Sequence, residues 1–171
     1  MIHDNRKFRI RRARIEKGFT LVEIIIVLVV GGILAAAVGF TISNINEGSR
    51  ISVAANNALS DLRYAQQIAM SERKDVDFTV NTGASTWAAT YTATGSYLKS
   101  SQDRSANMLV TLNTGNYSGV TMSGGYSGSI TFDSDGIPYQ GANELTGPLT
   151  LMTLNGKSSL VLQPSGFAQI E

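Results

Sequence analysis

The sequence predicts an α+β fold, in which a long N-terminal helix packs against an antiparallel β-sheet. Two observations lead to this prediction. Residues 19–72 contain no proline and carry apolar residues at helical spacing. From Asp75 onward the chain changes to short segments of alternating apolar and polar residues, separated by turn residues. A chain of 171 residues is long enough for one domain with a sizeable core and one extra element.

The first 18 residues form a basic arm. They hold seven lysine and arginine residues and two acidic residues, a net charge of +5. The other 153 residues hold seven basic and eleven acidic residues, a net charge of −4. Basic residues that flank a membrane segment tend to stay on the cytoplasmic side. We therefore expect residues 1–18 to be a cytoplasmic leader and the C-terminal body to lie across the membrane.

Residues 19–40 are predicted to be a transmembrane helix. The segment has 22 residues and one charge, Glu23, and as a helix it would reach roughly 33 Å, enough to cross a bilayer core. A cleaved signal peptide is one alternative, because Ala35 and Ala37 form an A-x-A pattern. A plain signal anchor is another. The length of the apolar run, its internal charge and the helical pattern beyond Ala37 count against the signal peptide.

Glu23 needs an explanation, because a charge at mid-membrane costs about 2.5–3.5 kcal/mol and normally has a partner. Cleavage between Gly18 and Phe19 would create a free α-amine four residues from Glu23. Ammonium and carboxylate would then neutralise each other within one chain or between neighbouring helices. In this interpretation Glu23 fixes docking and register, a use of buried charge seen in other assemblies.

The stretch from Lys17 to Glu23, KGFTLVE, followed by an apolar run, resembles the class III signal of type IV pilins and type II secretion pseudopilins. The resemblance implies that a prepilin peptidase cleaves after Gly18 and N-methylates Phe19, and that Glu23 assists insertion into a growing filament. Many major pilins carry a helix-kinking proline near the position of Phe40. The phenylalanine here implies a straighter helix or a minor subunit.

The same helix has small residues at a spacing that suits close packing. Pairs four residues apart let helix backbones approach each other in lipid. Gly and Ala are also simply common in membrane helices, and the sequence leaves this alternative open. The candidate packing residues are Gly31, Gly32, Ala35, Ala36 and Gly39.

Residues 41–72 are predicted to continue as an amphipathic helix. Its expected core face is Ala55, Ala58, Leu62, Ala65 and Ala69, widened by Leu59 and Ile68. Its expected wetter faces carry Asn56, Asn57, Asp61, Arg63 and Gln67. The alanine stripe is thin, so a sheet could pack closely against it.

Residues 73–171 are predicted to form a β-rich globular head. Alternation or short apolar runs mark strands at residues 76–80, 87–93, 108–112, 130–132, 149–154, 157–162 and 167–171. Asn155-Gly156 predicts a tight hairpin turn. Residues 92–107 and 113–129, rich in Ser, Gly, Thr, Asn and Tyr, are expected to be surface loops or edge strands.

The head also resembles a subgroup of this family. The stretch LSDLRYAQQIAMSERKDVDFTV, the Phe132-to-Gly136 hairpin and a last strand after Pro164-Ser165-Gly166 resemble the H-type pseudopilin of type II secretion and the FimT/FimU-type minor pilins. The resemblance implies a structural subunit of the priming complex at a filament tip. It implies as partners the prepilin peptidase, other pilin or pseudopilin subunits, an inner-membrane assembly platform and, before assembly, membrane lipid. A minor pilin for adhesion, motility or DNA uptake, and an unrelated signal-anchored periplasmic domain, stay open.

Composition restricts the chemistry of the head. The chain has no cysteine, and its one histidine is His3, so nucleophile systems built on Cys or His and the common zinc ligand sets are excluded there. No cofactor is expected. Asp133 and Asp135 are candidate calcium ligands, although a β-turn with Asx capping explains DSDG more simply. The same two residues with Glu144 could in principle supply paired carboxylates for hydrolysis, but acidic turns are common and we expect no enzyme.

Nucleic-acid binding is not expected, because the basic residues of the body are scattered and outnumbered by acids. Aromatic residues among Ser/Gly loops suit protein contacts instead. The tyrosines in question are Tyr91, Tyr97, Tyr117, Tyr126 and Tyr139.

Overall fold

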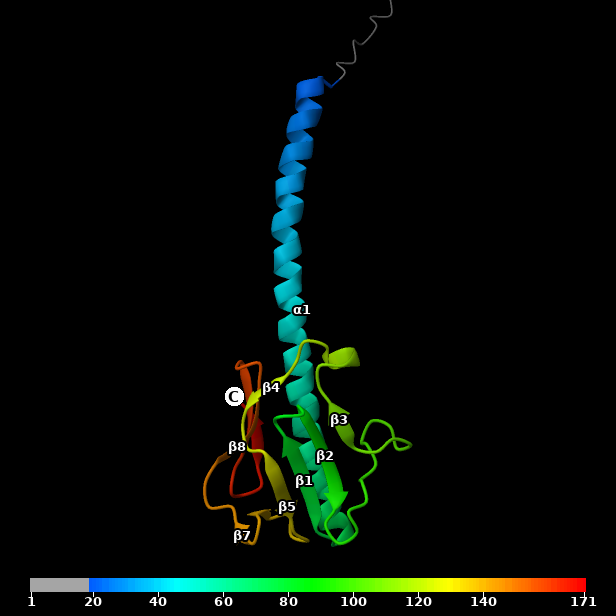
Figure 1. Ribbon diagram of the computed structural model, residues 1–171, viewed down its shortest axis with the longest axis vertical. Helices are drawn as coiled ribbons and strands as arrows, with labels where there is room; N and C mark the ends of the chain where they lie inside the picture. Colours follow the sequence, from blue (N-terminus) through cyan, green and yellow to red (C-terminus); the bar gives the residue numbers. More distant parts are fainter. Residues whose placement is uncertain (1–18) are drawn as a thin grey trace, which may run out of the picture. The chain divides into compact units, whose positions relative to one another are not determined.

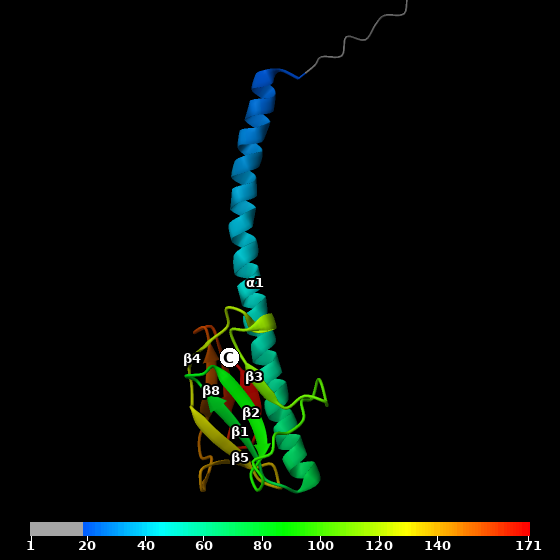
Figure 2. The same ribbon diagram turned by 45° about the vertical axis from the view of Figure 1, so that its right-hand side comes forward.

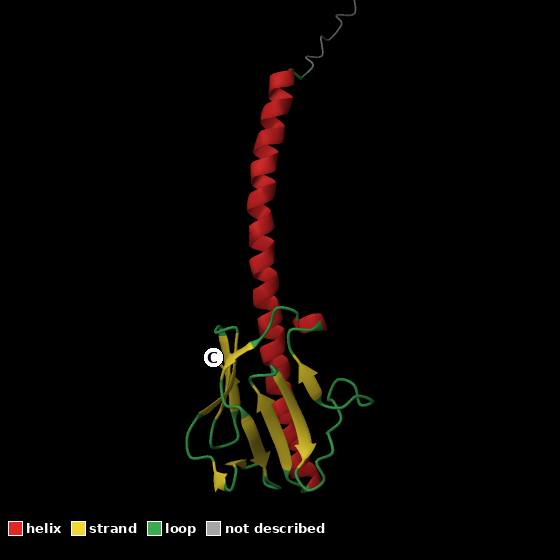
Figure 3. Cartoon of the chain, in the orientation of Figure 1, coloured by secondary structure: helices red, strands yellow, loops and turns green. Residues whose placement is uncertain are grey.

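The computed structural model describes residues 19–171, apart from the side chains of residues 36–46. The predicted α+β class is confirmed, with one long helix, α1 (Leu21–Glu72), followed by short strands in the described part of the chain. The chain divides into two units, Met1–Thr41 and Ile42–Glu171. The C-terminal part of α1 belongs to the same unit as the strands. Figure 3 shows that the head contains the end of this long helix, a second short helical segment, and strands joined by loops.

The part of α1 inside the head packs its alanine stripe into the core. Ala54, Ala58, Ala65 and Ala69 are completely buried, and Leu62 is almost so. Leu59 and Ile68 are half-buried beside them, as predicted. Methyl groups at 3–4 residue spacing leave room for strand side chains to reach the helix backbone. The large side chains of the core therefore come from the strands.

A six-stranded sheet packs across this face of α1 (Figure 1). Its neighbouring strands all pair antiparallel, in the order β3 (Leu109–Thr111), β2 (Thr86–Tyr91), β1 (Val76–Asn81), β5 (Gly128–Phe132), β6 (Pro138–Gln140) and β7 (Asn143–Glu144). Val76, Phe78 and Val80 alternate with more exposed residues, and all three point into the core. The alternation in the sequence therefore correctly identified the face of β1 that is buried.

A second, four-stranded sheet completes the head. Its order is β10 (Ala168–Ile170), β9 (Ser158–Leu162), β8 (Leu149–Leu154) and β4 (Met122–Gly124), again antiparallel. The C-terminus lies beside this sheet (Figure 1). The sequence predicted an antiparallel sheet without showing that the strands divide between two. Strand β6 is the second strand of the Phe132-to-Gly136 hairpin that the resemblance implied. Strand β7 was not predicted, because a segment of two residues is too short to show alternation.

The hairpin between β8 and β9 turns where the sequence predicts. Asn155 and Gly156 both have positive φ, 48° and 67°, which is the conformation of a type I′ turn. The Lys157 N–H donates to the Leu154 carbonyl at 2.9 Å. The Asn155 side chain also accepts the Thr121 N–H at 2.7 Å, so the same asparagine ties the hairpin to the segment that leads into β4.

The two expected loop regions are partly ordered by buried side chains. Residues 92–107 form no named strand, yet Leu98 within them is buried. Residues 113–129 contain a short 3₁₀ helix, η1 (Gly115–Tyr117), and all of β4, with Val120 and Met122 buried. A few buried apolar side chains therefore hold these segments in place, although their polar composition predicts loops.

Helix α1 ends at a residue in the left-handed conformation. Arg73 has φ 52°, and the Lys74 N–H donates to the Ala69 carbonyl at 3.2 Å, a Schellman-type closure that glycine favours.

Arg73→Gly is expected to raise the free energy of unfolding by about 1 kcal/mol, because a side chain in this conformation costs about that much. Chemical unfolding of the full chain in detergent, followed by Trp87 fluorescence, measures the change. Ser71→Gly, two residues earlier inside the helix, is the matched control and should destabilise by about 0.5 kcal/mol. Two changes of the same sign would contradict this account of the helix end.

Candidate functional site

The first turn of α1 is capped by its own sequence. The Thr20 hydroxyl accepts the Glu23 backbone N–H at 3.3 Å, and the Thr20 carbonyl accepts the Ile24 N–H at 3.2 Å. Thr-x-x-Glu is the capping-box pattern, and a carboxylate in the first turn also interacts favourably with the helix dipole. Glu23 was predicted to act in assembly, and this second, local role was not predicted. The signal that reveals it is the threonine three residues before the glutamate.

Phe19 and Glu23 lie on one face of the helix, as their spacing of four residues requires. Together with Ile24, Val27 and Leu28 they line a shallow groove. Glu23 is the one ionisable side chain among these five residues. The groove is therefore apolar with a single carboxylate near its N-terminal end. Gly18, the other residue of the predicted cleavage site, lies outside the described residues.

The side chains that follow are exposed on every side of the helix. All those from Phe19 to Ala35 are exposed, and the Phe19 side chain is 79% exposed. Fifteen of these seventeen residues are apolar or glycine. An apolar surface this extensive marks contact with a lipid phase or with other protein. Among the residues that the structure describes, none of the helical segments has the combined length and hydropathy needed to span a bilayer.

The predicted packing residues can be judged in part. A Cβ atom added at Gly31 or Gly32 would meet nothing within 4 Å. Among the residues that the structure describes, no contact explains why glycine stands at these two positions. Ala35 is exposed, whereas the side-chain surroundings of Ala36 and Gly39 lie outside the description.

The acidic turn after β5 uses its first aspartate for the backbone. One Asp133 carboxylate oxygen accepts the Asp135 N–H at 2.9 Å and the Ile137 N–H at 2.8 Å, and the Asp133 carbonyl accepts the Gly136 N–H at 2.9 Å. This is a β-turn with Asx capping, the simpler of the two interpretations. Within residues 19–171, as far as their side chains are described, no three His, Asp or Glu residues are grouped as metal ligands.

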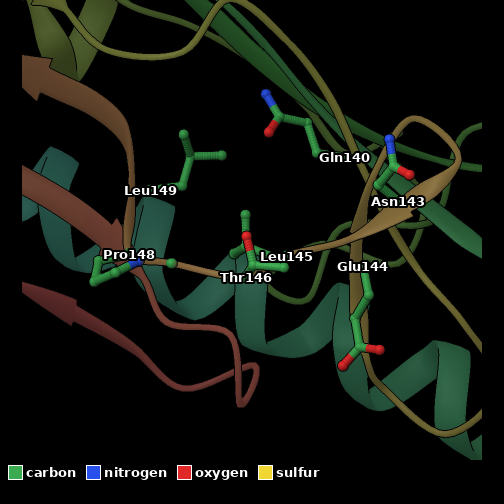
Figure 4. Close-up of a pocket in the computed structure, with 8 residues that line it drawn as sticks. Gln140, Asn143, Glu144, Leu145, Thr146, Pro148 and Leu149 are labelled. Atoms are coloured by element: carbon green, nitrogen blue, oxygen red, sulfur yellow. The ribbon is translucent and has the colours of Figure 1, made fainter.

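Glu144, the third candidate carboxylate, borders a shallow pocket on β7 and the segment that follows (Figure 4). In Figure 4 its carboxylate points away from Gln140 and Leu149, which line the same pocket. Neither Asp133 nor Asp135 lines it. Glu144 is the one ionisable residue of the lining, so the pocket lacks the paired carboxylates that hydrolysis of a glycoside would need.

The acids still share one side of the head. Partial desolvation, followed by the negative charges of Asp133, Glu144, Asp135 and Asp75, raises the pKa of Tyr139 above its ordinary value.

The tyrosines expected to make protein contacts differ in exposure. Tyr97 is 42% exposed, whereas the other four are half-buried. The Tyr117 hydroxyl accepts the Asn57 amide at 2.7 Å, and the Tyr91 hydroxyl donates to the Glu72 carboxylate at 3.0 Å.

The prediction for Asp61 was wrong. This residue was placed on a wetter face of the helix, but its side chain is buried, with 5% exposure. Its carboxylate accepts the Trp87 indole N–H at 3.0 Å and the Ser101 hydroxyl at 3.3 Å. Helical spacing from Ala58 is consistent with the buried face, but a buried carboxylate needs a partner, and the tryptophan that provides it lies on a strand 26 residues further along the chain.

Two family models match the chain at the places where these features lie. The prokaryotic N-terminal methylation motif matches residues 13–41, which include Phe19, Glu23 and the exposed apolar helix. This match indicates the class of protein, a pilin-like subunit. The model of the type II transport protein GspH matches residues 54–166, well over half of the chain and nearly all of the head. The chain belongs to the GspH family, a structural pseudopilin family rather than an enzyme family. Neither the curated proteins nor the solved structures give a match.

Proposed function

We propose that the chain is a minor pseudopilin, a structural subunit that primes and forms the tip of a type II secretion pseudopilus. The observation that carries this proposal is the methylation motif joined directly to an exposed apolar helix with a single carboxylate, Glu23. A helix with this surface needs contact with lipid or with other apolar protein surfaces, and packed helices of neighbouring subunits would supply the latter. The GspH-type head then supplies the outer surface of the tip.

Processing precedes assembly in this scheme. Residues 1–18 are a basic leader on the cytoplasmic side of the bacterial inner membrane, and a prepilin peptidase removes them by cutting after Gly18 and methylates Phe19. Residues 19–40 then hold the subunit in lipid, with residues 41–171 in the periplasm. An assembly platform moves the helix from lipid into the filament, driven by ATP hydrolysis in a partner protein. The new amino terminus of the same chain or of a neighbouring chain then neutralises the charge of Glu23.

Small residues support the packing of these helices. Gly31 and Gly32 have open space where a Cβ would stand, and Ala35 is exposed beside them. Backbones that approach closely at such residues gain dispersion contacts and lose little side-chain entropy. We assign Gly31, Gly32, Ala35, Ala36 and Gly39 to this helix–helix contact.

In-cell crosslinking followed by mass spectrometry tests the proposal, because one sample gives both the mature N-terminus and the partners. N-methyl-Phe19 crosslinked to type II secretion pseudopilins is the expected result. The same terminus crosslinked to pilus subunits would instead assign the protein to adhesion, motility or DNA uptake. A terminus after Ala37 without partners would overturn the whole filament scheme. Gly18→Leu is the matched control and should retain the Met1 end of the precursor.

A further inference from the structure

Asp61 is the one charged side chain that is buried among the residues whose surroundings are described. It lies on the inner face of α1, between Ala58 and Leu62, whose side chains are 0% and 1% exposed. On the strand side it meets Trp87 of β2, which is completely buried, and accepts its indole N–H at 3.0 Å. The proposed assembly through the N-terminal helix makes no use of this group.

The second partner of Asp61 comes from an exposed loop. Ser101, whose hydroxyl lies 3.3 Å from the other carboxylate oxygen, belongs to residues 100–107 in the connection between β2 and β3. Figures 2 and 3 show this connection standing out from the sheet beside β3. The loop closes on itself, because the Ser100 N–H donates to the Ala106 carbonyl at 3.0 Å. We call residues 100–107 the Ser101 loop.

Few side-chain contacts hold the Ser101 loop against α1. Apart from the bond to Asp61, the Gln102 amide donates to the Asn57 carbonyl oxygen at 3.3 Å. Asn57 in turn donates to the Tyr117 hydroxyl at 2.7 Å. Residues 101–107 are all exposed. The loop is therefore fastened at its base and free along most of its length.

Both partners of the Asp61 carboxylate are neutral. Trp87 on β2 and Ser101 on the loop donate to it, and η1 contributes Tyr117, whose ring centroid is 6.3 Å from that of Trp87. The charged residues of the loop region, Lys99, Asp103 and Arg104, are exposed and do not perturb Asp61. Burial raises the pKa of Asp61, while the hydrogen bonds from Trp87 and Ser101 act in the opposite direction.

We propose that Asp61 is a proton-operated latch for the Ser101 loop. When the carboxyl group is protonated, its carbonyl oxygen accepts the Trp87 N–H and its own O–H donates to the Ser101 hydroxyl oxygen, so the loop stays on α1. When the group is ionised, a buried charge without a cation is costly. Lifting the loop lets water reach the carboxylate and also uncovers Asn57 on the helix surface. The inference does not depend on which filament the subunit joins.

The direction of the pH effect follows from linkage. In the closed state Ser101 lies against the second carboxylate oxygen of Asp61, whose side chain is buried, and the effect of burial on the pKa exceeds the opposite effect of the Ser101 hydrogen bond. A closed loop that excludes water from this oxygen therefore binds the proton more tightly than an open one, so acid favours closure and rising pH favours opening. Each pH unit between the pKa values of the closed and open states changes the ratio of closed to open molecules about tenfold. Two independent measurements must therefore agree, the titration of Asp61 and the loss of loop protection.

Trp87 reports the titration directly, because it is the only tryptophan of the chain and is hydrogen-bonded to Asp61. The only histidine is His3 in the basic arm, so no imidazole of the head titrates in the same range. The experiment records Trp87 emission of the full chain in detergent from pH 4 to pH 8. Hydrogen exchange of the loop amides is measured in parallel, corrected for the intrinsic pH dependence of exchange, with β1 as the internal reference.

The expected result is an emission titration with a midpoint above that of an exposed aspartate, and loop protection that falls about tenfold for each pH unit of that difference. Asp61→Asn should abolish both pH effects. Ser101→Ala should leave the loop unprotected at every pH and should move the midpoint of the emission titration down to that of the open state. Circular dichroism confirms that each variant is folded. A wild-type emission that does not titrate, a titration that persists in Asp61→Asn, or loop protection that stays constant while Trp87 titrates would each overturn the latch.

Discussion

Gly166→Ala is expected to lower the free energy of unfolding of the head by about 2–3 kcal/mol. Gly166 has φ 78°, and a Cβ there would overlap the Gln66 side-chain nitrogen and lie 3.0 Å from the Gly136 carbonyl oxygen. Alanine in this conformation costs about 1–2 kcal/mol. Displacing Gln66 also breaks its 2.9 Å hydrogen bond to the Gly136 carbonyl, which is worth about 1 kcal/mol more. Chemical unfolding of the full chain measures the total.

The effect is large because both sheets meet the helix at this point. Gly136 lies in the turn between β5 and β6 of the six-stranded sheet, and Gly166 lies in the turn between β9 and β10 of the other sheet. Gln66 of α1 touches both turns. A Cβ at Gly136 would in addition lie 2.8 Å from the Met70 sulfur. The glycines are therefore needed for close approach as well as for their backbone conformation.

Two other glycines separate these contributions. Gly141 also has positive φ, 64°, but has open space around its Cβ position, so Gly141→Ala should show the conformational cost alone. Gly147 has open space and no positive φ, so Gly147→Ala should be close to neutral. Combining Gly166→Ala with Gln66→Ala should cost less than the sum of the two single changes, since the overlap disappears. Equal losses for Gly166→Ala and Gly141→Ala would show that Gln66 plays no part.

Local pattern predicted most of the fold. The stripe of Ala58, Leu62 and Ala65 and the alternation of Val76, Phe78 and Val80 each determine one buried face, and both faces were identified correctly. These patterns reflect burial along a single element, which the sequence records directly. The division of the strands between two sheets was not predictable in this way. It depends on which strand pairs with which, and β4 pairs with β8, about 30 residues later in the chain.

Asp61 shows the same limit for a single residue. It follows Ala58 by three positions, a spacing that places it on the buried face, but a charged residue is rarely buried without a partner. The indole N–H of Trp87 is that partner, and the position of Trp87 depends on how β2 packs against α1. Glu23 was the opposite case. Its assembly role rests on a motif of adjacent residues, and the Thr20 cap beside it was equally readable from the sequence.

Glu23 has two separate reasons to be a glutamate, one from the capping box and one from the proposed assembly. As the third helical residue it can stabilise the first turn, and glutamine serves that purpose nearly as well. As an assembly group it must carry a negative charge, which glutamine lacks. The groove that Glu23 shares with Phe19 brings the carboxylate near the residue that becomes the mature N-terminus in the proposed scheme. The two roles therefore predict opposite outcomes for one substitution.

Glu23→Gln is expected to reduce incorporation into the filament as severely as Glu23→Ala, by more than about tenfold, because removing one partner of a buried charge pair costs about 2–5 kcal/mol. Membrane insertion of both variants should be intact, since a neutral side chain is easier to place in lipid. The measurement is the yield of crosslinks to neighbouring subunits, normalised to the amount of processed protein in the membrane.

Thr20→Ala, which removes the cap at Glu23 N–H but keeps the charge, is the matched control and should assemble nearly as well as the wild type. If Glu23→Gln assembled normally while Glu23→Ala and Thr20→Ala both failed, the carboxylate would serve the helix end alone and the charge-pairing scheme would have to be abandoned.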